Sequence, residues 1–297
     1  MSAYRFCRTD DIGLLVDALN RCWAPHFPDE PPMTPAAFKR SIRNLQVWCS
    51  SCMVAFAGSD PIGVLIGAKR PSGTLVQKIA VHPDHRRQGH GRHLLASLGS
   101  KLAILGPPRI VAEVPEALTA ASRLFSASGY VQEGVLTDYV LQREEEDPPA
   151  VNGHGGGFVI PVTVDDLVAN GLLDEPPSHP AAARQDHPQV CWERSVETLT
   201  ARKDEIAGLA VASDERIEAY ILYATRGPTG EILGLRTFVD DVEARLGALL
   251  NRLRALREME FLFPKVHPSE ISQEALARLG FRPAGWHRLY ATRARSQ

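Results

Sequence analysis

The stretch from Thr74 to Leu98 constrains the fold most strongly, because it joins three local patterns in a fixed order. An apolar, β-branched run ends at Val81, a basic turn follows, and apolar residues at helical spacing begin near Gly91. Gly89 and Gly91 allow a tight turn whose backbone N–H groups are not covered by a Cβ. The positive end of the helix dipole points at the same turn. We therefore interpret this turn as the seat of a pyrophosphate.

The charge and the glycine spacing of this turn exclude two common kinds of phosphate-binding motif. Within residues 82–93 three arginines stand against one acid: Arg86, Arg87 and Arg92 against Asp84. A P-loop needs a lysine followed by serine or threonine after its glycines, and none follows here. A dinucleotide-binding turn needs a third glycine at the position of Leu94, and its glycines begin directly at the strand end. Here residues 82–88 intervene, so both motifs are excluded.

The remaining pattern resembles the signature of the GCN5-related N-acetyltransferase (GNAT) superfamily, Arg/Gln-x-x-Gly-x-Gly/Ala after a Val-x-Pro strand end. In this sequence Val81-His82-Pro83 is followed by Arg86-Arg87-Gln88-Gly89-His90-Gly91. The resemblance implies that the turn binds the pyrophosphate of acetyl-CoA. A solvated basic turn that caps a helix is the alternative. The implied cofactor-binding residues are Ile79, Ala80, Val81, Arg86, Arg87, Gln88, Gly89, His90, Gly91 and Arg92.

A second segment strengthens the resemblance, since AEVPEALTAASRLFSASGY aligns without a gap with the second signature of the superfamily. Glu113 falls on the strand glutamate that several members, notably the ribosomal-protein alanine N-acetyltransferases, use as general base. Two positions depart from the signature: Leu118 replaces the usual asparagine, and Phe125 replaces the tyrosine that protonates the departing thiolate. Phenylalanine has no such proton. Either Tyr130, Tyr139 or water supplies it, or the domain binds acyl-CoA and transfers slowly or not at all.

The acceptor side is implied by the same resemblance. Residues 24–35 are proline-rich and lie between two helical patterns, as in the helix–loop–helix that walls the acceptor site in the superfamily. The candidate substrate-binding residues are Trp23, His26, Phe27, Asp29 and Glu30, whose two acids hint at a cationic amine. A surface loop anchored by two aromatic residues is the alternative. The resemblance further implies direct acyl transfer, with residues 75–81 pairing the pantetheine amides and a backbone N–H near Ala80 or Val81 polarising the thioester carbonyl.

Bulk properties exclude several classes of protein. The 297 residues are enough for two domains, and a net charge of −2 gives no sign of nucleic-acid or anionic-membrane binding. No stretch approaches the ~20 apolar residues of a membrane span, and the first residues lack the apolar region of a signal peptide. We expect a cytoplasmic protein whose partners are acetyl-CoA and an amine, with no nucleic acid, membrane or metal site. A homodimer is left open.

The spacing Cys49-Ser-Ser-Cys52 is that of a redox or zinc pair. It lies in VWCSSCMVAF, which predicts a strand over residues 47–57, where positions three apart face opposite sides. Zinc would also need a second ligand pair. We interpret both cysteines as small core residues.

An acidic and proline-rich run followed by VNGHGGG marks the strongest composition shift, so we predict domains at residues 1–145 and 159–297 with a linker at 146–158. The second half repeats the plan of residues 47–143. The predicted fold class is α/β (α+β), with two tandem GNAT-like acyl-CoA N-acyltransferase domains. Each is a mixed, mostly antiparallel sheet flanked by helices.

The equivalent turn of the second half has lost its anion-binding character. Residues 239–245 hold three acids against one arginine and no glycine, and carboxylates repel a pyrophosphate. Asp240 and Asp241 are better explained as helix N-terminal residues. We predict a degenerate, non-catalytic second domain.

Three functions stay open. The first is an N-acetyltransferase (acyltransferase) that moves an acetyl group from acetyl-CoA to a primary amine of a small molecule or protein N-terminus. The second, favoured by Phe125 and Leu118, is a non-catalytic acyl-CoA-binding or regulatory protein. The third is an interaction scaffold, which the intact basic turn disfavours.

Overall fold

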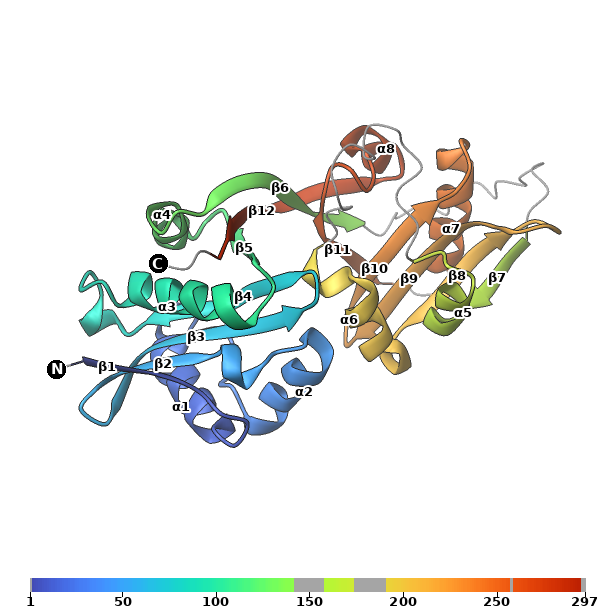
Figure 1. Cartoon of the computed structure of the whole chain (residues 1–297). Coiled ribbons are helices and arrows are strands. Elements are labelled where there is room, and N and C mark those ends of the chain that lie inside the picture. Colours follow the sequence, from blue (N-terminus) through green and yellow to red (C-terminus); the bar gives the residue numbers. More distant parts are fainter. Residues whose placement is uncertain (1, 142–157, 174–190, 257–258, 295–297) are drawn as a thin grey trace. The chain divides into compact units, whose positions relative to one another are not determined.

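The computed structural model describes residues 2–141, 158–173, 191–256 and 259–294. The chain divides into two compact units. Unit 1 comprises residues 1–134 and 288–297, and unit 2 comprises residues 135–287. Figure 1 labels the helices and strands of both units.

Unit 1 is built on a sheet with the strand order β1-β2-β3-β4-β5-β12-β6, to which β12 and β6 contribute one end each. The strands are β1 (Ser2–Phe6), β2 (Met53–Ala57), β3 (Asp60–Arg70), β4 (Gly73–Val81), β5 (Arg109–Pro115), β6 (Val131–Leu141) and β12 (Phe281–Arg293). The first four pair antiparallel in sequence, whereas β4 and β5 are parallel. The predicted mixed, mostly antiparallel sheet is confirmed.

Four helices flank this sheet: α1 (Ile12–Cys22), α2 (Pro35–Leu45), α3 (His90–Leu105) and α4 (Thr119–Ala127). In Figure 1, α1 and α2 lie on one face and α3 and α4 on the other. α2 begins as predicted, because Thr34 Oγ1 accepts a hydrogen bond from the Ala37 N–H at 3.1 Å. The core between the sheet and α3 holds four helical leucines together with Phe125 of α4: Leu94, Leu95, Leu98 and Leu102.

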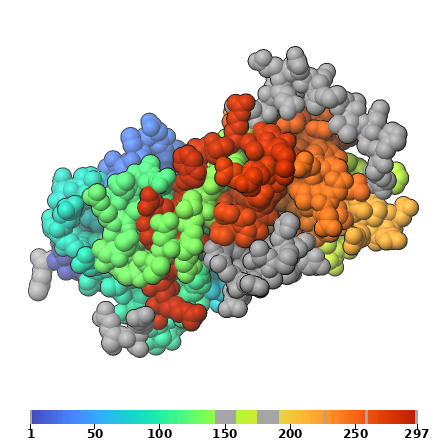
Figure 2. Space-filling view, turned by 90° about the horizontal axis from the view of Figure 1, so that it is seen from above, coloured from blue at the N-terminus to red at the C-terminus, as the bar shows by residue number. Residues whose placement is uncertain are grey.

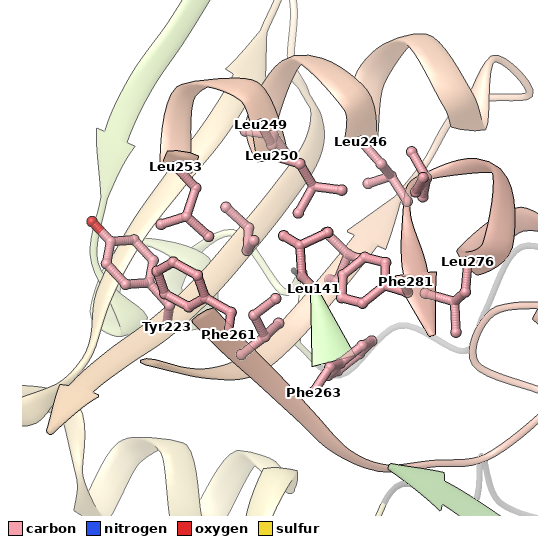
Figure 3. Close-up of a cluster of buried hydrophobic side chains, with 14 of the residues drawn as sticks. Leu141, Tyr223, Leu246, Leu249, Leu250, Leu253, Phe261, Phe263, Leu276 and Phe281 are labelled. Atoms are coloured by element: carbon pink, nitrogen blue, oxygen red, sulfur yellow. The ribbon is translucent and has the colours of Figure 1, made fainter. Parts of the chain in front are cut away.

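Unit 2 repeats this plan, with the strand order β12-β6-β11-β10-β9-β8-β7. Its further strands are β7 (Phe158–Val162), β8 (Ala207–Ala212), β9 (Ile217–Arg226), β10 (Thr229–Thr237) and β11 (Glu260–Val266). Its helices are α5 (Val164–Ala169), α6 (Val196–Ala201), α7 (Val242–Leu256) and α8 (Gln273–Arg278). β10 and β11 are parallel, as β4 and β5 are. The leucines of α7 pack against the aromatic side chains of Phe261 and Phe281 (Figure 3).

The division of the chain differs from the predicted boundaries of 1–145 and 159–297. Unit 1 ends at Gly134, inside β6, and it includes residues 288–297 at the end of the chain. Figure 2 shows the red C-terminal residues among green residues of unit 1. Composition marks loops, but a strand that continues from one unit into another carries no composition signal. Residues 146–157 of the predicted linker lie outside the described residues, and Phe158 begins β7.

The strand predicted over residues 47–57 is wrong in its first half. Cys49–Ser51 form a 3-10 turn, and β2 starts only at Met53. This turn packs over β3 where Gly67 has no side chain, and a Cβ there would lie 2.6 Å from the Ser51 carbonyl oxygen. Cys49 and Cys52 are both buried, as predicted, and burial raises the pKa of both thiols.

Candidate functional site

Unit 1 contains a cavity of about 650 Å³ at the point where β4 ends and α3 begins. Its walls come from the end of α1 with the following 3-10 turn, the end of β4, the turn before α3, and α4. Among its lining residues are four arginines and three histidines and no aspartate or glutamate: Arg86, Arg87, Arg92, Arg123, His26, His85 and His90. Such a lining favours an anionic ligand.

The turn before α3 has the backbone of an anion site. α3 begins at His90 directly after Gly89, whose φ of 88° is in the left-handed region that glycine adopts without strain. Arg87 also has a positive φ, 63°, which is unusual for a residue with a Cβ and frequent at ligand sites. The first N–H groups of α3 have no acceptor within the helix, so they face the turn as free donors.

Gly91 also has a packing role. A Cβ at this position would lie 3.0 Å from Leu124 Cδ2 on α4. Gly91 therefore lets the first turn of α3 approach α4, and this contact closes one side of the cavity.

β4 and β5 separate beside the cavity. Their parallel pairing joins Thr74 to Ile110 and Leu75 to Val111, although β4 continues to Val81. A bulge at Gln77 coincides with the separation, since Ile66 of β3 pairs with Lys78 and Gly67 with Val76. The β5 side of residues 76–81 is thus a strand edge, which can pair with the amides of an extended ligand.

His26 connects the two sides of the cavity. Its Nε2 lies 3.2 Å from the Val81 carbonyl oxygen, and Nη2 of Arg86 lies 2.6 Å from Nδ1 and 2.9 Å from Nε2. The pKa of His26 is lowered by burial, and the Arg86 and His82 charges add to this, while the hydrogen bond with Val81 opposes it. The imidazole is therefore neutral near pH 7.

Of the predicted acceptor residues, Trp23, His26 and Phe27 line the cavity, whereas Asp29 and Glu30 do not. The Trp23 and Phe27 rings stack at 4.4 Å. Glu30 is already engaged: its carboxylate accepts from Trp23 Nε1 at 3.0 Å and lies 3.5 Å from Lys78 Nζ. Asp29 is exposed. The expectation that these acids attract a cationic amine therefore loses its support from Glu30.

The predicted proton-transfer residues lie away from this lining. Glu113 is on the face of β5 opposite to Ile110, Ala112 and Val114, which point into the core. Tyr130 is buried, its hydroxyl has no hydrogen-bond partner among the described residues, and burial raises its pKa. Neither side chain lines the cavity. Their catalytic roles stay predictions.

The packing of Tyr139 and Phe125 shows that both side chains belong to hydrophobic cores. Tyr139 belongs to unit 2, where it is part of the hydrophobic core, and it does not line the cavity of unit 1, so its role as a candidate acid stays a prediction. Tyr139 lies in that core because β6 pairs with β11 in a register that joins Tyr139 to Phe263. The local sequence does not predict this register. Phe125 is 2% exposed and packs between the rings of Tyr130 and Tyr290, at centroid distances of 5.1 and 5.8 Å.

On the donor side, every predicted residue except Gln88 lines the cavity. The prediction missed His85 and the α4 residues, which include Arg123 and Leu124. Helical spacing within the second signature could have revealed them, because Ala120, Leu124 and Ala127 share one face of α4.

Unit 1 thus combines a cation-rich cavity with a strand–turn–helix junction. Residues 48–132 match the model of the acetyltransferase (GNAT) domain. Unit 1 is thus similar to the GNAT acetyltransferase domain over these residues, and the chain as a whole has the fold of tandem GNAT proteins. Members of this family transfer acyl groups and use acetyl-CoA. No curated protein matches the chain.

Solved structures of similar fold cover almost the whole chain. A tandem GNAT protein from the clavulanic acid biosynthesis pathway is 17% identical, with 100% of both chains covered and a TM-score of 0.66. A GCN5-related N-acetyltransferase from Sphaerobacter thermophilus is 15% identical over 99% of this chain and 96% of its own, with a TM-score of 0.66. One from Kribbella flavida is 13% identical over 98% and 70%, with a TM-score of 0.65. At these identities the likeness concerns the fold.

No helix in the described part of the chain combines the length and apolar character needed to cross a membrane. No group of three or more metal-ligating side chains is placed to hold a metal ion within those residues.

Proposed function

We propose that unit 1 is an N-acetyltransferase that moves an acetyl group from acetyl-CoA directly to a primary amine of a small molecule or protein N-terminus. The observation that carries this proposal is the cavity itself, with its arginines at the N-terminus of α3 beside the open edge of β4. Arg86 and Arg87 and the N–H groups of the turn would hold the diphosphate. Residues 76–81 would pair with the pantetheine amides.

Acetyl-CoA supplies an activated acyl group in this scheme, and the protein orients it and excludes water. A backbone N–H at Ala80 or Val81 would stabilise the negative charge that develops on the carbonyl oxygen. The resemblance implies Glu113 as the proton acceptor, either directly or through a water. Since Glu113 does not line the cavity, it would act through water. Trp23 and Phe27 would form the apolar wall that faces the acceptor.

Thermal unfolding in the presence of ligands tests the first part of this proposal. Coenzyme A and acetyl-CoA should raise the melting temperature of the full chain, whereas NAD should not, since unit 1 lacks a dinucleotide-binding turn. Coenzyme A release with a panel of primary amines then tests transfer. Absence of any shift with coenzyme A would contradict the proposal.

The second candidate is an acyl-CoA-binding protein without activity. It is favoured by Phe125, which takes the place of the acidic tyrosine, and by the absence of carboxylates and tyrosines from the cavity lining in the described residues. Binding of coenzyme A without release from acetyl-CoA by any amine would select it.

A further inference from the structure

The cavity lining contains three histidines: His26, His85 and His90. His90 is 5% exposed, and its Nδ1 lies 2.6 Å from the Tyr4 hydroxyl. His85 belongs to the 3-10 turn Pro83–His85. Only His26 comes from the wall that faces the acceptor while also touching the end of β4.

The surroundings of His26 indicate which ring nitrogen carries the proton. The Val81 carbonyl oxygen can only accept, so Nε2–H donates to it at 3.2 Å. Nδ1 then holds the lone pair. Nη2 of Arg86 lies 2.6 Å from Nδ1 and 2.9 Å from Nε2, so the guanidinium lies across the ring beside both nitrogens. In this arrangement Nδ1 is a base that the Arg86 guanidinium covers.

Arg86 is also one of the residues proposed to hold the diphosphate. It forms no ion pair with a described residue, so an anion at the N-terminus of α3 competes with a neutral imidazole for its N–H groups. Charge-assisted hydrogen bonds to phosphate are about twice as strong as neutral ones. Diphosphate binding therefore draws Arg86 away from His26 and uncovers Nδ1.

We propose that His26 is a catalytic residue that accepts the proton lost by the acceptor amine. This inference rests on the proposed function. The amine nitrogen forms a bond to the thioester carbon, the carbon–sulfur bond breaks, and its electron pair leaves with sulfur. The amine proton passes to Nδ1 of His26, and the imidazolium returns it to the thiolate. The products are the amide and the coenzyme A thiol, and the histidine is neutral again.

This assignment accounts for two features that the predicted residues leave unexplained. It places a proton acceptor in the cavity lining, where Glu113 is absent, and it supplies the acid that Phe125 cannot. The charged and titratable groups around His26 are Arg86 and His82, with the Val81 carbonyl as its polar contact. Burial, Arg86 and His82 together keep its pKa below the ordinary value, so the base form is present at neutral pH.

The test compares the full-length protein with three variants: His26→Gln, Glu113→Gln and His93→Gln. His93 is the matched control, because it is an exposed histidine of α3 that packs on Tyr4 and does not line the cavity. Coenzyme A affinity is measured by calorimetry, and turnover of acetyl-CoA with the amine panel is followed across pH.

We expect His26→Gln to retain coenzyme A affinity and to lower kcat by about 100-fold, the range typical of general acid–base groups. The fall of kcat/KM on the acid side of the pH profile, where His26 becomes protonated, should disappear with it. His93→Gln should match the wild type.

The outcomes separate this inference from the proposed function. If the wild type does not bind coenzyme A, the proposed function fails and the inference with it. If it binds and turns over, but His26→Gln keeps its rate and pH profile while Glu113→Gln loses them, only the inference is overturned. Binding without turnover of any amine would also overturn it.

Discussion

The two units share one fold but use their charges differently at the strand-to-helix turn. In unit 1, residues 82–89 separate β4 from α3, whereas in unit 2 only residues 238–241 separate β10 from α7. The shorter turn has no glycine or arginine, and Asp241 Oδ1 accepts from the Ala244 N–H at 3.3 Å. The N-terminus of α7 therefore receives a carboxylate from its own chain, as predicted for Asp241, while that of α3 faces a cavity.

The two units also differ in whether their arginines are paired and in whether the strand after the helix carries a carboxylate. Arg245 of α7 is paired with Glu218 at 2.8 Å, and Arg194 with Glu270 at 2.7 Å. Arg86 forms no such pair with a described residue. The residue of unit 2 that corresponds to Glu113 is Pro264, because Pro264 precedes Gly280 by the same number of residues as Glu113 precedes Gly129. Unit 2 therefore has no carboxylate at this strand position. The arginines Arg245 and Arg194 of unit 2 form ion pairs within the unit, whereas Arg86 of unit 1 remains available to a ligand. The fold alone therefore does not make a binding site.

The largest effect is expected at Arg194 of unit 2. Its side chain is 2% exposed, makes two 2.7 Å hydrogen bonds to Glu270 and lies over the Phe263 ring. Arg194→Ala removes a buried guanidinium and leaves the part-buried carboxylate of Glu270 with the His267 N–H but without its cation, so the free energy of unfolding should fall by about 3–5 kcal/mol. Arg92→Ala is the control, and this exposed residue should change stability by less than about 0.5 kcal/mol. Equal losses of unfolding free energy for Arg194→Ala and Arg92→Ala in urea titrations would contradict the contrast between paired and unpaired arginines.

The next effect concerns binding rather than stability. Arg86→Glu places a carboxylate where the diphosphate is proposed to sit, so the Kd for coenzyme A should rise by about 100-fold, or about 2.7 kcal/mol. The matched variant Arg252→Glu, on the exposed side of α7, should leave the Kd unchanged. Calorimetry decides this, and an unaltered Kd for Arg86→Glu would remove Arg86 from the donor site.

A pH dependence is expected from Asp138 in unit 2. Burial raises its pKa, but the hydrogen bonds from His287 and the Lys265 N–H, both at 2.8 Å, outweigh this and lower it overall. Its stabilisation is therefore present above the ordinary aspartate pKa, about 3.9, and is lost as the pH falls through the lowered value.

Asp138→Asn should cost about 1–2 kcal/mol at pH 7, and the difference from the wild type should shrink below about pH 4 in chemical unfolding. Asp214→Asn, at an exposed position, is the control. A difference that is constant with pH would show that the charge of Asp138 is not what stabilises unit 2.

The smallest effect is on the backbone of the turn in unit 1. Gly89→Ala puts a Cβ on a residue with φ of 88°, which should lower stability by about 1–2 kcal/mol and weaken coenzyme A binding. Gly99→Ala, inside α3 with open space around its Cβ position, should instead raise stability by about 0.5–1 kcal/mol. Thermal unfolding of both variants measures this, and a neutral Gly89→Ala would contradict the assigned geometry.

Local signals were sufficient to predict the strand–turn–helix junction in unit 1. The strand end at Val81, the glycine at 89 and the helix that follows are neighbours in sequence, so their geometry could be predicted. Contacts between distant segments could not be. His26 meets Arg86 across sixty positions, and the turn at Cys49 depends on the space above Gly67. The place of Tyr139 depends on which end of β6 joins which unit.

Calorimetric titration of the full chain with coenzyme A tests the central claim most directly. The account predicts one molecule bound per chain, and no binding when Arg86→Glu alters unit 1. No binding at millimolar ligand, or two molecules per chain, would contradict the assignment of a single site to unit 1.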